Sequence, residues 1–245
     1  NPLALETVPA ASAAQVESQT VEHFITDRAD RLIGYHNHRY AATYRDSLSS
    51  LSNAERMQFG QTAEVTKAAA ASLFKLMAIK DEYEVARLYA DPNFHKDLEE
   101  RFGKGVRPSY YLSPPFLNLF LATPRKFRFG YWMRPIFQLL STVRFLRQTP
   151  FDLFGYQRER REERQLIAEF LTIVEMVASH LNRSNAEVAV ELLESPMNIK
   201  GFGHVKEKSM RAYKEQLPSR IDRFMNAKVM SADRPAEPRE QRVSL

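Results

Sequence analysis

The chain contains no cysteine in its 245 residues and only 8 glycines. Without thiolates it cannot form a disulfide, ligate an iron–sulfur cluster through cysteine or use a cysteine nucleophile. No apolar run reaches the roughly 20 residues that a membrane-spanning helix needs, and the densest one, residues 110–122, is interrupted by Pro114 and Pro115. These absences predict a cytoplasmic protein with no membrane partner.

Scarce glycine, together with abundant alanine, leucine, glutamate and arginine, favours helices over a β-barrel or a doubly wound sheet. Apolar residues recur every three or four positions over residues 18–48 and 157–181, which predicts two long amphipathic helices. Asp91 before Pro92 has the residue types of a helix start, and we predict a short helix from there to Gly103.

Two further helix starts are predicted from side-chain spacing. Ser52 with Glu55, and Ser184 with Glu187, have the spacing of a capping box, in which the two side chains satisfy the first amides of a helix. We therefore expect one helix to begin at Ser52 and to continue to about residue 90. A second helix is expected to follow Ser184.

Residues 106–130 differ from the rest because they are aromatic, proline-broken and without helical periodicity. The segments RPSYYLS and RKFRF within them predict two short strands, which we expect to pair. The predicted fold class is therefore mainly α, with a small β insert. We expect a flexible linker over residues 1–17, one helical domain over 18–230 and a disordered tail over 231–245. The first residues lack an initiator methionine and a signal-peptide layout, so we expect a fragment of a longer chain.

Positive charge is concentrated in the middle of the chain. The net charge is +5 overall, yet residues 101–164 hold thirteen basic and four acidic residues, a net charge of +9. This imbalance predicts contact with something negative, either nucleic acid or an acidic protein surface. Within the region, RERREER at 158–164 alternates in charge, which favours a solvent-exposed helix face whose side chains pair with each other, Arg158 with Glu162 and Arg160 with Glu163.

Two other polar clusters favour unremarkable interpretations. His36 and His38 are two residues apart on the predicted helix, so they point about 200° apart and cannot chelate one metal ion together. No HExxH or His-x3-His spacing occurs in the sequence, and we predict no metal site. The carboxylates in KDEYE, residues 80–84, are interpreted as charge on a helix surface.

The stretch NIKGFGHVKEK, residues 198–208, combines two glycines with a histidine and three lysines. One interpretation is a helix–helix turn in which the glycines adopt positive φ or allow close packing. The other is an anion or interface site at the start of the following helix. The candidate residues for the second interpretation are Lys200, Gly201, Gly203, His204 and Lys206, and both interpretations stay open.

Five stretches, read together, resemble the C-terminal region of indolepyruvate ferredoxin oxidoreductase. This region follows the pyruvate-oxidoreductase γ-type domain in fused 2-oxoacid:ferredoxin oxidoreductases. The similarity covers about residues 18–228 in the family's order, and Lys200 stands where many relatives have arginine. The stretches are LFKLMAIKDEYEVARLY (73–89), YLSPP (111–115), FGYWM (129–133), DLFGYQRERREERQLIAEF (152–170) and IKGFGHVKE (199–207).

The resemblance implies a parent oxidoreductase that oxidatively decarboxylates 2-oxo acids to acyl-CoA, with thiamine diphosphate, iron–sulfur clusters, CoA as co-substrate and ferredoxin as acceptor. This chain has neither the GDG…N thiamine-diphosphate signature nor a cysteine. We therefore expect no cofactor and no catalytic residue in it, and a non-catalytic, architectural or interface role. The expected partners are the parent's other domains, above all the γ-type domain, and ferredoxin through the parent. A homodimer stays open.

The alternative from a different class is a helical module that binds nucleic acid, or another partner, through residues 101–164. The alternating charges at 158–164, with no aromatic stacking partners beside them, count against nucleic acid. A weaker third hypothesis, an independent enzyme with His204 as base, lacks a convergent nucleophile or carboxylate in the sequence.

Overall fold

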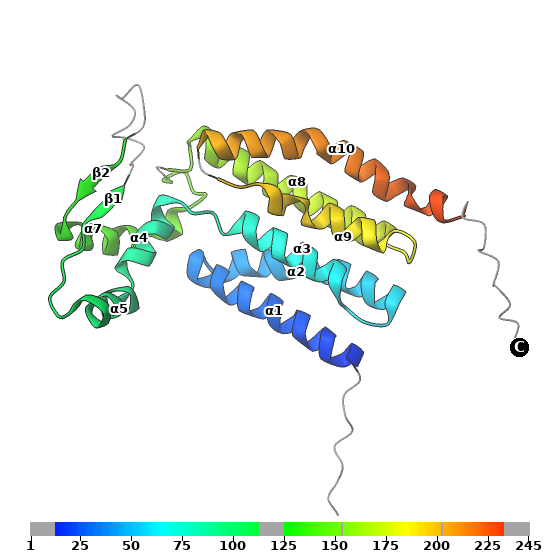
Figure 1. Cartoon of the computed structure of the whole chain (residues 1–245), viewed down its shortest axis with the longest axis horizontal. Helices are drawn as coiled ribbons and strands as arrows, with labels where there is room; N and C mark the ends of the chain where they lie inside the picture. The colour runs from blue at the N-terminus through cyan, green and yellow to red at the C-terminus, as the bar shows by residue number, and fades with distance from the viewer. Residues whose placement is uncertain (1–12, 113–124, 153, 202, 233–245) are drawn as a thin grey trace, which may run out of the picture. The chain divides into compact units, whose positions relative to one another are not determined.

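A computed structural model describes residues 13–112, 125–152, 154–201 and 203–232. The prediction of a mainly helical fold with a small β insert is confirmed, because helices make up most of the described chain and its strands form one two-stranded sheet. The chain divides into two compact units (Figure 1). Unit 1 comprises the described parts of residues 1–34, 38–77 and 164–245, and unit 2 comprises residues 35–37 and the described parts of 78–163. A single domain over residues 18–230 stays a prediction.

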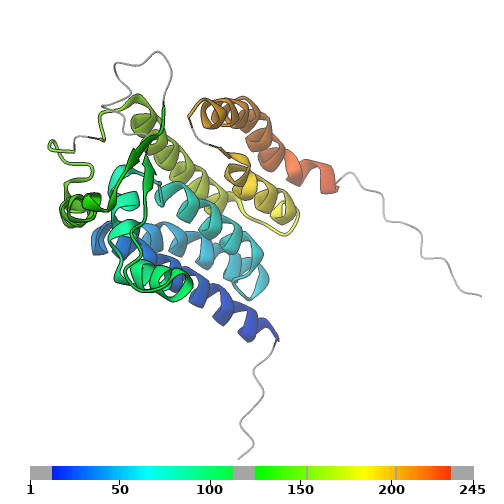
Figure 2. The same ribbon diagram turned by 60° about the vertical axis from the view of Figure 1, so that its left-hand side comes forward.

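Unit 1 is a set of packed helices. α1, α2 and α3 lie side by side in both ribbon views (Figures 1 and 2), α3 packs on α9, and α9 packs on α10. Helix α8 supplies most of its length to this unit and its first six residues to unit 2. The helices are α1 (Ala13–Tyr35), α2 (His38–Phe59), α3 (Glu64–Met77), α8 (Arg158–His180), α9 (Ala186–Glu194), the 3-10 helix η3 (Ser195–Asn198) and α10 (His204–Ala232).

The core of unit 1 follows the predicted apolar periodicity. The large side chains that are fully buried come from six of its helices, and they are Leu32, Tyr44, Leu48, Leu51, Leu73, Met77, Phe170, Val174, Val177, Leu192, Leu193 and Phe224. The helix predicted over residues 157–181 is confirmed as α8. Helix α10 continues through Pro218, which lies on an exposed side and interrupts the pattern without ending the helix.

Three of the predicted helix boundaries before residue 91 are wrong. The helix predicted over residues 18–48 is divided after Tyr35, and the chain restarts with α2 at His38. Ser52 lies inside α2 and does not begin a helix. Its hydroxyl is 2.9 Å from the hydroxyl of Thr62, in the connection to α3. The helix expected to run on to residue 90 is instead three helices, α2, α3 and α4 (Glu82–Ala90).

Glu55, which was assigned to a capping box with Ser52, caps a different helix. Its side chain is buried, and its two carboxylate oxygens accept the backbone N–H groups of Val65 at 2.9 Å and Thr66 at 3.0 Å. These amides belong to the first turn of α3 and have no partner within that helix. A negative charge at a helix N-terminus is also favourable for the helix dipole. Glu55 therefore joins α2 to the start of α3.

The capping box predicted at Ser184 does not form either. The residue before α9 is Asn185, and its side chain accepts the backbone N–H of Asn182 at 2.8 Å and donates to the carbonyl of His180 at 2.9 Å. The amide thus closes the turn between α8 and α9. Ser184 bonds to the side chain of Asn182.

Unit 2 contains α4, α5 (Pro92–Phe102), the strands β1 (Tyr110–Leu112) and β2 (Phe127–Phe129), and α7 (Arg134–Thr142). The 3-10 helices η1 (Tyr131–Met133) and η2 (Val143–Leu146) flank α7. The strands are antiparallel, with Tyr111 opposite Arg128, so the predicted pairing is confirmed. The loop predicted between them lies largely outside the described residues. The start predicted at Asp91 is also confirmed, since its side chain accepts the N–H of Asn93 at 2.9 Å and α5 ends before Gly103.

An aromatic cluster forms the core of unit 2. Tyr110 from β1 and Phe137 from α7 are buried, with ring centroids 4.9 Å apart in an edge-on arrangement. Tyr89 from α4 packs against both rings, at 5.0 Å and 5.2 Å. These contacts hold the sheet of β1 and β2 against α4 and α7. A two-stranded sheet needs such packing against helices for stability. Among the described residues, no helix combines the length and apolarity needed to cross a membrane.

Replacing Glu55 by alanine is expected to lower the free energy of unfolding by roughly 2–3 kcal/mol, because two buried amides lose a charged acceptor. Chemical denaturation monitored by circular dichroism measures this value. The matched control is Glu64→Ala, which removes an exposed carboxylate that pairs only with Lys67 in the same helix at 3.3 Å. An equal loss in both variants would show that the Glu55 cap does not stabilise the junction.

Candidate functional site

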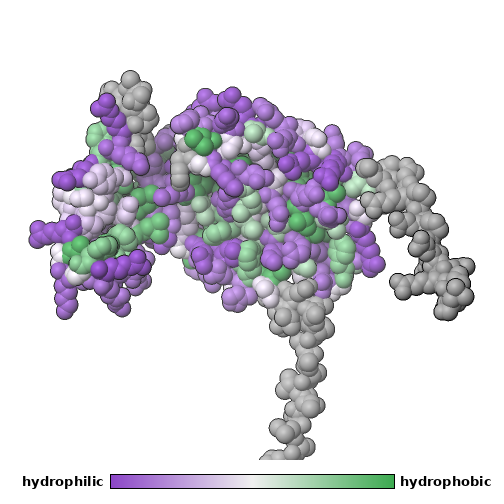
Figure 3. All heavy atoms as spheres, in the orientation of Figure 1, coloured by the Kyte–Doolittle hydropathy of each residue, from purple (hydrophilic) through white to green (hydrophobic). Residues whose placement is uncertain are grey.

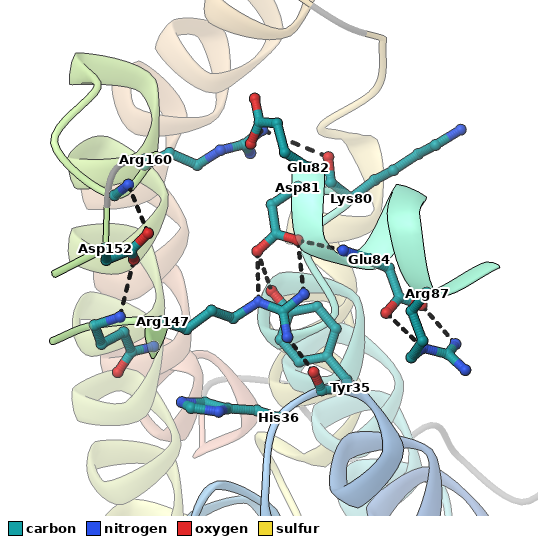
Figure 4. Close-up of polar contacts among 12 residues, drawn as sticks. Tyr35, His36, Lys80, Asp81, Glu82, Glu84, Arg87, Arg147, Asp152 and Arg160 are labelled. Atoms are coloured by element: carbon teal, nitrogen blue, oxygen red, sulfur yellow. Dashed lines mark hydrogen bonds and ion pairs between the residues drawn. The ribbon is translucent and has the colours of Figure 1, made fainter. Parts of the chain in front are cut away.

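A buried ion pair lies at the centre of unit 2 (Figure 4). Arg147, directly after η2, donates from Nε to Oδ2 of Asp81 at 2.6 Å and from Nη2 to Oδ1 at 2.7 Å. Oδ1 of Asp81 also accepts the N–H of Glu84 at 2.7 Å, so that the same carboxylate caps α4. Oδ2 accepts the hydroxyl of Tyr35 at 3.4 Å. Each oxygen of Asp81 therefore has two donors.

The guanidinium of Arg147 is enclosed on its other sides as well. Its Nη1 donates to the backbone carbonyl of Tyr35. Its Cζ atom lies 4.0 Å from the centre of the Tyr35 ring and 5.3 Å from the centre of the Tyr83 ring. Burial by itself would lower the pKa of Arg147, but the hydrogen bonds and charge of Asp81 outweigh it and raise the pKa. The arginine is thus permanently charged and fully engaged.

This geometry corrects the interpretation of KDEYE as surface charge. Asp81 and Tyr83 are buried, and only Lys80 is exposed among residues 80–84. Asp81 is saturated with donors, so it holds structure together and has no oxygen left for acid–base work. Sequence reasoning missed the pair because its members are 66 residues apart.

Asp152, also buried, organises the turn that follows Arg147. It accepts the N–H groups of Gln148 at 2.9 Å and Gly155 at 3.0 Å. A Cβ atom at Gly155 would lie 2.3 Å from Oδ2 of Asp152, so only glycine fits there. Burial, followed by the charge of Asp152, raises the pKa of Tyr83 to about 12. The turn is thus fitted closely around one carboxylate.

The start of α8 carries a second charged cluster (Figure 4). Arg160 donates to Glu163 at 2.7 Å and lies 3.7 Å from Glu82, which belongs to α4. The predicted pairs Arg158–Glu162 and Arg160–Glu163 both form, at 2.7 Å each. The prediction of a solvent-exposed face holds for Arg158 and Arg161, whereas Glu163 is buried and Arg160 largely so.

Within this cluster, the ionised carboxylate of Glu82 is poorly stabilised. Burial raises the pKa of its carboxyl, and the more distant Arg160 opposes that effect only in part. Arg160 has Glu163 as its closer partner, and its own pKa is raised because both carboxylates outweigh the effect of burial. The ionised form of Glu82 is therefore disfavoured in the folded chain.

The two histidines considered for metal binding lie at the junction of α1 and α2. His36 follows α1 and His38 begins α2, so the argument that both share one helix is wrong. Burial, followed by the charge of Arg147, lowers the pKa of His36, which keeps it neutral near pH 7. In the parts of the chain that the structure describes, no group of three or more histidine or acidic side chains could hold a metal ion.

The glycine loop is a tight turn between η3 and α10. Gly201 and Gly203 have positive φ, +93° and +53°, and a Cβ atom at Gly201 would lie 2.5 Å from Cγ1 of Val205. Ser209 in α10 fastens the loop, because its hydroxyl accepts the N–H of Lys200 at 3.1 Å and lies 2.9 Å from the Lys200 carbonyl. The predicted turn with positive φ is therefore confirmed; positive φ favours glycine at both positions, and the contact with Val205 adds to this preference at Gly201.

The same turn brings lysines together. Lys75 in α3 donates to the carbonyls of Pro196 at 3.1 Å and Met197 at 2.8 Å, which places its ammonium group beside the loop. Its pKa is lowered by burial and then by the nearby charges of Lys200 and Lys206. We call Lys75, Lys200 and Lys206 the lysine cluster. Positive charges that act on one another in this way favour an anionic ligand or surface.

The structure thus assembles most, but not all, of the predicted site. Lys200 and Lys206 lie together, and Gly201 and Gly203 shape the turn between them. His204 is exposed at the start of α10. Lys75 was not predicted, although a lysine within the apolar stretch ASLFKLMA was a signal that could have drawn attention to it.

Comparisons with known proteins identify one family. Residues 21–219 match a family of unknown function, DUF6537, and the chain belongs to that family. No curated protein matches the chain. No solved structure matches it either.

Replacing Arg147 by methionine is expected to lower the free energy of unfolding by about 3–5 kcal/mol, because Asp81 is left buried without its counter-charge. Urea denaturation measures the change. The matched control, Arg158→Met, removes an exposed arginine with one carboxylate partner and should cost less than about 1 kcal/mol. Equal losses in the two variants would contradict a central role for the Asp81 pair.

Replacing Glu82 by glutamine is expected to change how stability depends on pH. A carboxyl whose pKa is raised by folding favours the folded state at low pH, and this contribution is lost as pH rises through the folded pKa. Relative to the native chain, Glu82→Gln should therefore gain stability as pH rises above 4.5. Thermal unfolding between pH 4 and 7 measures it, with the exposed Glu99→Gln as control. The raised pKa of Glu82 would be refuted if Glu99→Gln gained as much stability with rising pH, or if Glu82→Gln gained none.

Proposed function

Starting from membership of this family of unknown function, we propose that the chain is the C-terminal, non-catalytic domain of a 2-oxoacid:ferredoxin oxidoreductase of the indolepyruvate type. Its role is architectural: it docks on the other domains of the parent enzyme, the γ-type domain first among them. The parent oxidatively decarboxylates 2-oxo acids to acyl-CoA and passes electrons to ferredoxin. The observation that carries the docking role is the lysine cluster beside the glycine turn.

The positions of the resembling stretches support this proposal. KDEYEVARL contains Asp81, the acceptor of the buried ion pair, and DLFGYQRER contains Asp152 and Arg160. IKGFGHVKE contains both glycines with positive φ and two members of the lysine cluster. The residues that carry the resemblance are thus those on which the fold and the cluster depend.

The cofactors of the proposed parent do not fit this chain. An iron–sulfur cluster is held by cysteine thiolates, and the sequence has no cysteine. The thiamine-diphosphate signature is also absent from the sequence. We therefore assign both cofactors to other domains of the parent and derive no step of the reaction through this chain.

The lysine cluster suits an acidic partner surface. Lys75 is partly desolvated, and its ammonium group is fixed by two backbone carbonyls, so little side-chain entropy remains to be lost on binding. An acidic group on the partner would relieve the repulsion among the three ammonium groups. Such contacts give association that is specific and sensitive to salt.

The nucleic-acid alternative loses some of its basic residues in the structure. Arg147 is buried against Asp81, and Arg160 and Arg158 pair with glutamates. Two of the thirteen basic residues in 101–164, Arg147 and Arg160, are therefore held inside unit 2, and Arg158 is paired at its surface. The interface proposal depends on none of them.

Replacing Lys75, Lys200 and Lys206 together by alanine is expected to weaken binding to the rest of the parent chain by at least roughly tenfold, or about 1.4 kcal/mol. The parent is expressed without this chain, and titration calorimetry at low and high salt measures the affinity. Ferredoxin reduction with indolepyruvate reports whether the chain restores activity. Adding His204→Ala tests the fourth predicted residue.

The matched control replaces three exposed lysines elsewhere, Lys67, Lys80 and Lys96, by alanine, so that both triple variants have the same net charge. It should bind like the native chain. Equal weakening in both triple variants would assign binding to net charge instead of the cluster. An absence of binding by the native chain, with full activity of the truncated parent, would refute the proposed function.

A further inference from the structure

Three large apolar side chains are exposed along one side of η1 and α7. Trp132, Ile136 and Leu139 are 61%, 39% and 64% exposed. Their spacing of four and three residues places them on one face of a helix. A different face carries Met133 and Phe137, which are buried in the core of unit 2. We call the exposed set the α7 stripe.

The position of Trp132 is fixed by its neighbours. Its indole is 6.0 Å from the ring of Phe129 in β2, in an edge-on arrangement. A Cβ atom at Gly130 would lie 3.2 Å from Cδ1 of Trp132, so the absence of a side chain there leaves room for the indole. An exposed tryptophan held in one place needs little ordering when a partner covers it. Tryptophan is also among the residues that dominate interface energies.

The part of the sequence that contains the stripe carries charge of one sign. Residues 101–151 contain no aspartate or glutamate and nine lysines and arginines. Six of these bases are exposed, and they are Arg101, Lys104, Arg107, Arg125, Lys126 and Arg128. Arg128 stands opposite the exposed Tyr111 in the ribbon, and Lys126 shares its face because side chains alternate along a strand. Figure 3 shows hydrophobic surface beside hydrophilic side chains on the part that contains α5 and α7.

We infer that the α7 stripe docks an acidic protein segment that presents apolar side chains, on another domain of the parent enzyme. The inference rests on the proposed function and adds a second contact, on unit 2, to the lysine cluster of unit 1. Apolar side chains of the segment cover Trp132, Ile136 and Leu139. Its carboxylates face the bases of residues 101–151.

Charge and side-chain type select this occupant over two others. A second copy of the chain in a symmetric contact would bring the same acid-free region against itself, and like charges would repel. Single-stranded nucleic acid binds by stacking bases on aromatic rings, whereas Ile136 and Leu139 are aliphatic. Aromatic, aliphatic and arginine side chains together are typical of a protein interface.

The single tryptophan of the chain makes the stripe directly observable. Chain labelled with 5-fluorotryptophan gives one ¹⁹F resonance, that of residue 132, which is followed while the unlabelled remainder of the parent is added. We expect the resonance to shift with one-to-one saturation, and added salt to weaken the binding. Leu139→Glu should reduce the affinity at least tenfold. The matched control Leu88→Glu, on an exposed position of α4 outside the stripe, should leave it unchanged.

Each other outcome overturns the inference. If size exclusion shows a complex but the resonance does not move, the proposed function stands and the stripe is not its contact. If no complex forms, the proposed function fails and the inference with it. A shift on adding oligo(dT) instead assigns the stripe to nucleic acid, and a shift on concentrating the chain alone assigns it to a second copy.

Discussion

The bidentate contact between Asp81 and Arg147 is the interaction on which unit 2 depends. Burying two charges is expensive, and it is tolerated only where geometry is good and the remaining donors and acceptors are satisfied. Both conditions hold here: each oxygen of Asp81 has two donors, and the guanidinium reaches the carbonyl of Tyr35 as well. Because the same carboxylate caps α4, the start of that helix and the end of η2 are fixed together, which orients α4 towards the aromatic core.

Features that depend on neighbours in the chain were predicted well from the sequence. The Asp91–Pro92 start, the paired strands and α8 follow from capping chemistry, β-propensity and helical periodicity. Glu55 shows where this reasoning ends. Its spacing from Ser52 fits a capping box, yet the carboxylate caps a helix ten residues ahead, because tertiary packing buries it beside those amides. A spacing rule cannot distinguish the two partners, since both supply backbone N–H groups.

Only the part of the candidate site that lies within one stretch of sequence could be predicted, because tertiary packing places the rest. Gly201 and Gly203 predict a turn with positive φ, and the lysines beside them can be read from the sequence. Lys75 precedes its carbonyl acceptors by more than 120 residues, and only the packing of α3 near η3 brings it there. In the same way, Arg147 resembles any other base of the positive middle region until the fold places it against Asp81. Long-range pairing decides which charges are structural.

That division of the basic residues bears on what the chain is built to do. Arg147 and Arg160 are bound to carboxylates in the interior of unit 2, and they stabilise its turns and helix starts. The charges of Lys200 and Lys206 act on Lys75 in the lysine cluster, and the acid-free residues 101–151 include an exposed apolar stripe. Neither arrangement stabilises the isolated domain, because charges of one sign repel and the exposed apolar side chains stay in contact with water. Both become favourable when an acidic, partly apolar surface covers them, and this supports docking as the function over chemistry within the chain.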